Sequence, residues 1–147
     1  MPERYSVEIL LIEDNPYDVE LTLHAFAQGK LANRIRVLRD GAEALEYIFG
    51  NGAFADRNVL DLPRLILLDI KLPKVNGIEV LSRIRADART RQVPVVVLTS
   101  SHEEQDIAET YNLGVNSYVV KPVDFDDFAR AVTELGCYWV LMNRPPY

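Results

Sequence analysis

Short runs of Val, Ile and Leu alternate with amphipathic segments along the whole chain. Runs of this kind predict strands, which we place at residues 7–14, 34–41, 65–69, 93–101 and 117–120. Apolar side chains that recur every three or four positions predict helices at residues 15–29, 42–50, 76–87, 102–114 and 125–142. The chain therefore alternates strand with helix from one end to the other.

Such alternation is typical of α/β proteins, in which helices cover both faces of a parallel sheet. The runs at 9–12, 65–68 and 95–98 are apolar throughout and suit central strands, whereas charge flanks the run at 34–41 and suits an edge. We expect a flavodoxin-like, doubly wound α/β sheet of five parallel strands in the order 2-1-3-4-5, with five helices.

Local signals support the first helix and mark one long connection. Asn15 is a good N-cap, Pro16 fits the first helical position, and Gly29 fits the helix end. The connection at 51–64 is longer than usual. Within it, Phe54 and Leu60 either pack locally or contact a partner.

Composition narrows the class of protein. The chain has 147 residues, 48% of them hydrophobic, and a formal net charge of −6, which fits one domain with a substantial core. Arg34, Arg36 and Arg39 lie on the predicted edge strand, where charge opposes aggregation, so we expect no nucleic-acid partner. Cys137 is the only cysteine, which excludes an intramolecular disulfide and a cysteine-based zinc site. The first residues resemble neither a signal peptide nor a membrane span, and we expect a cytoplasmic protein without a membrane partner.

Reactive side chains follow the predicted strands. The first strand ends at Glu13 and Asp14, the third at Asp69, the fourth at Thr99 and Ser100, and the fifth runs into Lys121. In the expected order the first and third strands are neighbours, at the switch point where such sheets open a crevice. One polar residue at a strand end means little because loops begin there, but this set has complementary chemistry. We expect these side chains to meet in one small cup.

The charges in that cup indicate its ligands. Three carboxylates close together repel one another, and a divalent cation removes the repulsion. Oxygen ligands without His or Cys favour Mg²⁺ or a similar hard ion over zinc. Lys121 adds a positive charge and Thr99 a hydroxyl, which suit the oxygens of a phosphoryl group. Because the sequence has no glycine-rich phosphate loop, we expect that this group is not part of a bound nucleotide.

The motifs ED at 13–14, LLDIKLPKVNG at 67–77, VVVLTSS at 95–101 and SYVVKPV at 117–123 resemble the receiver domain of two-component response regulators in order and spacing. The likeness covers residues 7–135. It implies that Asp69 accepts a phosphoryl group from a phosphohistidine on a sensor histidine kinase or a phosphotransfer protein. The protein would then be a switch and not a metabolic enzyme.

The resemblance also implies roles for the other site residues. Mg²⁺ or Mn²⁺ would be bound by Asp14, Asp69 and the backbone carbonyl of Lys71, with Glu13 acting mainly through water. Lys121 would pair with the acceptor and then with the phosphoryl group. Thr99, followed by Ser100, would bind a phosphoryl oxygen, and Tyr118 would swing inward when that hydroxyl moves. The Lys121–Pro122 bond would be cis, an isomer largely confined to proline.

Two positions depart from the family pattern. Glu13 stands where Asp is commoner, which shifts a water-mediated contact without abolishing metal binding. Lys71 places a long cation two residues after the acceptor. We hypothesise that it shields the acyl phosphate and slows hydrolysis.

The end of the chain bears on output. We expect residues 1–147 to form a single receiver domain with an extended C-terminal helix and tail, and no output domain. Tyr138, Trp139, Leu141 and Met142 widen the apolar face of the last helix, and we expect a homodimer through the fourth helix, fifth strand and fifth helix. The segments IEDNPYDVELTLHAF and YWVLMNRPP resemble the stand-alone regulators paired with bacterial phytochromes, which suggests a light-responsive pathway with a phytochrome as partner.

Two other functions remain open from the residues alone. A phosphohydrolase of the haloacid dehalogenase type also uses Asp, Thr or Ser, and Lys on an α/β sheet, but it would want a second Asp where this chain has Lys71. A pseudo-receiver that binds partners without phosphorylation would usually have lost an acid or the lysine, and this chain keeps both.

Overall fold

The computed structural model of the chain describes residues 7–31 and 34–147. The strands are β1 (Ile9–Ile12), β2 (Ile35–Leu38), β3 (Leu65–Leu68), β4 (Val95–Thr99) and β5 (Ser117–Val120). The helices are α1 (Pro16–Gln28), α2 (Gly41–Phe49), α3 (Gly77–Ala86), α4 (Glu104–Asn112) and α5 (Phe125–Gly136). A 3-10 turn at Gly52–Phe54 follows α2, and a π-helical segment, Cys137–Met142, continues α5.

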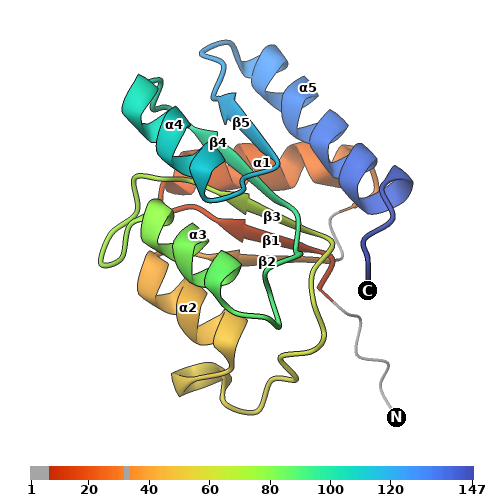
Figure 1. Cartoon of the computed structure of the whole chain (residues 1–147). Coiled ribbons are helices and arrows are strands. Elements are labelled where there is room, and N and C mark those ends of the chain that lie inside the picture. Colours follow the sequence, from red (N-terminus) through yellow and green to blue (C-terminus); the bar gives the residue numbers. More distant parts are fainter. Residues whose placement is uncertain (1–6, 32–33) are drawn as a thin grey trace.

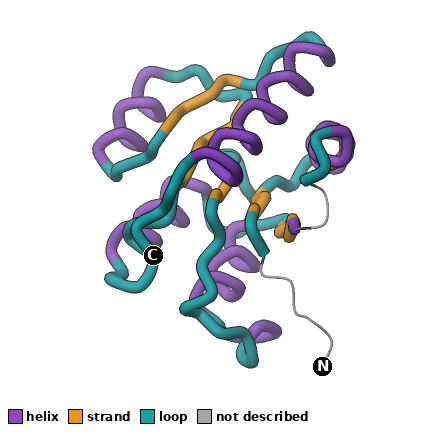
Figure 2. Tube along the Cα trace, turned by 90° about the vertical axis from the view of Figure 1, so that its right-hand side faces the viewer, coloured by secondary structure: helices purple, strands orange, loops and turns teal. Residues whose placement is uncertain are grey.

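The strands form one parallel sheet in the order β2-β1-β3-β4-β5, which confirms the predicted doubly wound topology (Figure 1). Every side chain of β1, β3 and β4 is buried, as expected of strands covered on both faces. β2 lies at one edge and carries Arg36, as the sequence indicated. Figure 2 shows helices on both sides of the strands.

Two hydrophobic clusters lie on opposite faces of the sheet, because successive side chains of a strand point in opposite directions. One cluster joins Leu10 and Ile12 of β1 to α2 and α3. The other joins Ile9 and Leu11 to α1 and α5 and includes the fully buried Phe26. The sheet is therefore held rigidly between two cores, and its strand ends are fixed in position.

Side-chain caps set where the helices begin. The Asn15 side chain accepts hydrogen bonds from the backbone N–H groups of Tyr17 and Asp18, as predicted for the start of α1. Asp40 and Asn76 cap α2 and α3 in the same way. Each of these helices therefore begins immediately after a residue whose side-chain oxygen accepts a hydrogen bond from the first turn.

Several elements have other bounds than the sequence predicted; the strand predicted at 93–101, for example, spans only Val95–Thr99. The predicted first strand extends to residue 14, but β1 ends at Ile12, and the backbone N–H of Glu13 still donates to Leu38 O at 3.0 Å. Within the 51–64 connection, Phe54 packs edge-on against Tyr47 with ring centres 5.1 Å apart, whereas Leu60 is 71% exposed. The last predicted helix is α-helical only to Gly136, after which its turns widen to π geometry.

Candidate functional site

The polar strand ends meet at one edge of the sheet. β1 and β3 are neighbours with Ile12 opposite Leu68, so the acids that follow these strands lie side by side. The backbone N–H of Asp69 donates to Ile12 O at 3.0 Å, and the N–H of Lys121 donates to Thr99 O at 2.7 Å. Backbone pairing therefore continues one residue beyond the strands and holds Asp69 and Lys121 in position.

Glu13, Asp14 and Asp69 form a group of carboxylates whose ligand oxygens all lie within 4.8 Å of one another. Glu13 and Asp69 are buried, with 3% and 6% of their surfaces exposed, and Asp14 is less buried than either. A set of three carboxylates without nitrogen or sulfur ligands fits a hard divalent cation such as Mg²⁺ or Mn²⁺. The residues present therefore suit the ion that the sequence predicted.

Lys121 neutralises part of this negative charge. Its ammonium lies 2.6 Å from Glu13 Oε1, 2.7 Å from Asp18 Oδ2 and 3.2 Å from Asp69 Oδ2. Only 10% of the Lys121 side chain is exposed. An ammonium has three hydrogens, so these three acceptors use all of them.

Two pKa values are shifted by this arrangement. Burial, followed by the nearby charge of Asp69, raises the pKa of Glu13 to about 8, although Lys121 acts in the opposite direction. Burial alone would lower the pKa of Lys121, but its hydrogen bonds to Asp18 and Glu13 outweigh that effect and raise the pKa above its ordinary value. Lys121 is therefore a permanent cation, whereas Glu13 takes up or releases a proton near neutral pH.

The other oxygen of Asp69 is held by different donors. The Thr99 hydroxyl donates to Asp69 Oδ1 at 2.6 Å, and the backbone N–H of Lys71 donates to the same oxygen at 3.2 Å. Behind the carboxylate, Gly77 packs so closely that an added Cβ would lie 2.2 Å from the Asp69 carbonyl oxygen. Asp69 is thus oriented by hydrogen bonds at both oxygens and by close packing of its own backbone.

A second small network lies beside Asp69. The Ser101 hydroxyl donates to Asp106 Oδ2 at 2.6 Å, and the Lys71 ammonium lies 3.6 Å from the same oxygen. The Tyr118 hydroxyl donates to Ser101 O at 2.9 Å, and burial raises the pKa of Tyr118. The Lys71 side chain, 59% exposed, therefore points to α4 and not across Asp69.

Two sequence expectations do not match this geometry. Ser100 is exposed, because it alternates with Thr99 and its side chain leaves the opposite face of the strand. The Lys121–Pro122 bond was expected to be cis, but every peptide bond in the described residues is trans. The trans form is the intrinsically favoured isomer. With it, the Lys121 ammonium still contacts Glu13, Asp18 and Asp69.

Three residues of the site were missed by the sequence reasoning. Asp18 was assigned only to the first turn of a helix, although a helix that follows β1 must begin at the same edge of the sheet. Ser101 and Asp106 were overlooked as well. The alternation that turns Ser100 outward turns Ser101 inward beside Thr99, so strand periodicity could have indicated it.

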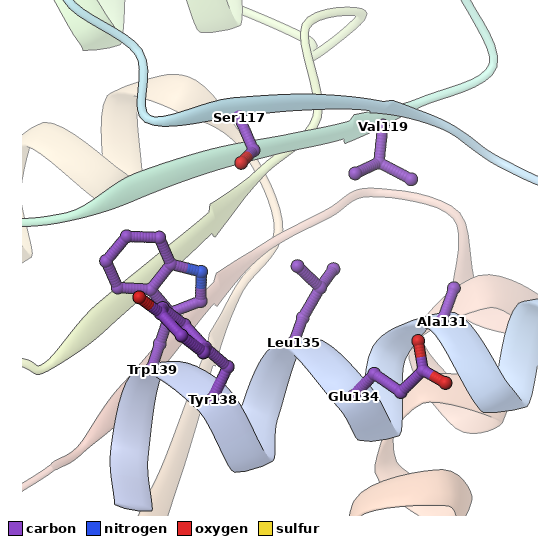
Figure 3. Close-up of a pocket in the computed structure, with 7 residues that line it drawn as sticks. All are labelled: Ser117, Val119, Ala131, Glu134, Leu135, Tyr138 and Trp139. Atoms are coloured by element: carbon purple, nitrogen blue, oxygen red, sulfur yellow. The ribbon is translucent and has the colours of Figure 1, made fainter. Parts of the chain in front are cut away.

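The expected dimer residues form an apolar surface at the end of the chain. Tyr138, Leu141 and Met142 are exposed by 49%, 67% and 72%, whereas Trp139 is partly buried. Tyr138 and Trp139 also line a groove of about 470 Å³ between β5 and α5, in which Leu135 points toward the strand (Figure 3). Among the described helices, none combines the length and hydrophobicity that crossing a membrane requires.

Comparison with known proteins identifies what this chain resembles. A family model described as the response regulator receiver domain matches residues 9–133. A probable methanogenesis regulatory protein, FilR2 of Methanothrix harundinacea, is 44% identical over 94% of this chain and 86% of its own length.

Solved structures give a similar result. The phosphorylated cyanobacterial phytochrome response regulator RcpA superposes with a TM-score of 0.87 at 36% identity, over 95% of this chain and 97% of its own. The Mn²⁺-bound form of response regulator Rcp1 gives 0.85 at 34% identity, over 95% and 98%. The bacteriophytochrome response regulator RtBRR is 52% identical with a TM-score of 0.74, over 94% and 82%.

Proposed function

Because the chain belongs to the response regulator receiver family, we propose that it is a stand-alone switch whose Asp69 accepts a phosphoryl group from a sensor histidine kinase or phosphotransfer protein. The phosphorus–nitrogen bond of the donor phosphohistidine breaks as a phosphorus–oxygen bond to Asp69 forms. The observation that carries the proposal is the position of Asp69. Its two oxygens meet Thr99 and Lys121, and it adjoins two further carboxylates.

Each neighbour of Asp69 has a defined task in this reaction. Asp14, Asp69 and the backbone carbonyl of Lys71 would hold Mg²⁺ or Mn²⁺, with Glu13 acting mainly through water. The bound ion would offset the negative charge that gathers during transfer. Lys121 donates to the incoming phosphoryl oxygens, and Thr99 exchanges its bond to Asp69 for one to the phosphoryl group. Ser101, whose backbone N–H donates to the Thr99 hydroxyl, and Tyr118, whose hydroxyl donates to Ser101 O, respond to that exchange.

The phosphohydrolase alternative has less support. Its general acid–base would stand at position 71, where a lysine pairs with Asp106. The pseudo-receiver alternative has less support too, because the acids and the lysine that such proteins usually lose are present and in contact. We therefore favour a switch that signals through protein–protein contacts over a metabolic enzyme.

The partner is expected to be a sensor kinase, and relatives give two different leads. RcpA and RtBRR are named as phytochrome and bacteriophytochrome response regulators, which favours a light-sensing kinase. FilR2 is named for methanogenesis. The higher identity of RtBRR makes a bacterial phytochrome the first partner to test.

Phosphorylation can be tested with a small phosphodonor. We expect wild-type protein incubated with acetyl phosphate and Mg²⁺ to gain the mass of one phosphoryl group, and Asp69→Asn to gain none. Ser100→Ala is a matched control, since Ser100 is exposed beside the site, and it should behave as wild type. Absence of label in the wild type would favour the pseudo-receiver, and turnover of small phosphate esters would favour the phosphohydrolase.

We also propose that the apolar surface of Tyr138, Leu141 and Met142 supports a homodimer through α4, β5 and α5. The exposure of these side chains and the adjoining groove support this proposal. Sedimentation at tens of micromolar, with and without beryllofluoride, tests it. A monomer in both conditions would contradict it.

A further inference from the structure

Asp18 contacts the site without belonging to its group of acids. It lies in the first turn of α1, and its Oδ2 is 2.7 Å from the Lys121 ammonium, closer than Asp69 Oδ2 at 3.2 Å. Its side chain is only 19% exposed. Of the three carboxylates that Lys121 contacts, Glu13 and Asp69 belong to the candidate metal group and Asp18 does not.

This difference matters when a cation occupies the group. Glu13 and Asp69 would then share their charge with the ion, and the ion and the ammonium would repel each other because both are cations. Asp18 is the one contacting carboxylate that remains free to neutralise Lys121. Without it, the ammonium would turn fully toward Glu13 and Asp69 and compete with the metal for the same oxygens.

We propose that Asp18 is a positioning residue, which holds the Lys121 ammonium at the margin of the acidic group so that the divalent cation and the lysine occupy the site together. The inference rests on the proposed metal site. It assigns Asp18 no contact with the metal or the phosphoryl group, and it acts only through Lys121.

A simpler role for Asp18 exists, and it makes a different prediction. Acids in the first turn of a helix favour the helix dipole, and the N–H of Asp18 is already bonded to Asn15. If Asp18 contributed charge alone, its removal would weaken cation binding by the same factor whether or not Lys121 is present, because Coulomb energies of fixed charges add. A positioning role requires that the two residues be coupled.

The test is a double-mutant cycle on the full chain, with Mn²⁺ binding followed by calorimetry and electron paramagnetic resonance. We expect Asp18→Asn to weaken Mn²⁺ binding about tenfold, at the lower end of the losses seen when the outer shell of a metal site is changed, because the released Lys121 ammonium would compete for the oxygens of Glu13 and Asp69. In the Lys121→Met background the same change should weaken it only about twofold, as a screened charge would. Glu20→Gln removes an exposed charge from the same helix and should have little effect.

A second measurement does not depend on the Lys121 variant. In a crystal structure of Asp18→Asn with Mn²⁺, the Lys121 ammonium should have left its wild-type position. An ammonium in its wild-type place, or equal losses of affinity in both backgrounds, would overturn the inference and leave the proposed function intact. Failure of the wild type to bind Mn²⁺ would overturn the metal site itself, and the inference with it.

Discussion

Cation binding should displace a proton from Glu13. The metal-free protein holds this carboxyl with a pKa of about 8, because it is buried beside Asp69. At pH 7 such a group is about 0.9 protonated, and at pH 9 about 0.1. Metal ligands and their close neighbours must be ionised, so Mg²⁺ binding should release about 0.9 proton at pH 7 and about 0.1 at pH 9.

Calorimetry measures this number directly. Titrations of the metal-free protein with Mg²⁺ in buffers of different ionisation enthalpy, such as HEPES and Tris, give the protons released from the slope of heat against buffer enthalpy. Glu13→Gln has no proton to release, and its slope should be close to zero at every pH. Wild-type release that is absent at pH 7, or that persists in Glu13→Gln, would refute the reasoning.

The same shift has a consequence for stability with a definite sign. A carboxyl whose pKa is raised on folding contributes stability that is fully present below its unfolded pKa and is lost as the pH rises to the folded value. Between pH 4.5 and about 8, Glu13 should therefore lower the stability of the metal-free protein by at most about 1.4 kcal/mol per pH unit. Urea denaturation in EDTA should show this slope in the wild type and a smaller one in Glu13→Gln.

Three further predictions concern single residues. Gly77→Ala would place a Cβ atom 2.2 Å from the Asp69 carbonyl oxygen, so it should lower the midpoint of urea denaturation and weaken Mg²⁺ binding measured by calorimetry. The control is Gly29→Ala, whose Cβ atom would lie 3.6 Å from its nearest neighbour. Phe26→Ala removes a fully buried ring and should cost about 3–5 kcal/mol of unfolding free energy, measured by denaturation. Because the Lys71 ammonium lies 3.6 Å from Asp106 and points to α4, Lys71→Ala should leave the lifetime of the acyl phosphate unchanged, measured by loss of the phosphoryl group; a shortened lifetime would restore the shielding role that the sequence suggested.

The sequence predicted the sheet well because its evidence was local. Short continuous apolar runs between turn residues are typical of strands covered on both faces, and Asn15 and Asn76 have side chains that favour the N-cap position. Convergence of Asp14 and Asp69 followed from strand order alone. Contacts that depend on the direction of a side chain are harder to predict. Phe54 and Leu60 are both apolar residues of the 51–64 connection, yet Phe54 packs against Tyr47 and Leu60 is exposed.

Asp18 shows the same limit at the site. An acid in the first turn of a helix has an adequate local explanation, so nothing in the sequence called for a partner more than a hundred residues away. Ser101 differs from Asp18, because the alternation of the predicted strand already places Ser101 on the same face as Thr99. Long-range polar contacts therefore need coordinates, whereas strand faces do not.

The fully apolar character of β1 and β3 has a consequence for how the sheet finds its alignment. If β1 and β3 were shifted by one residue against each other, the hydrophobic clusters on both faces of the sheet would still receive Leu or Ile side chains. Hydrophobic contacts alone therefore cannot select the native register of the two strands. The shifted register is unfavourable at the strand ends, because it would bury Glu13 or Asp69 between the sheet and its helices without the Lys121 ammonium. Glu13 and Asp69 thus help to select the native register of β1 and β3. Replacing both with alanine should make sheets with a shifted register easier to form.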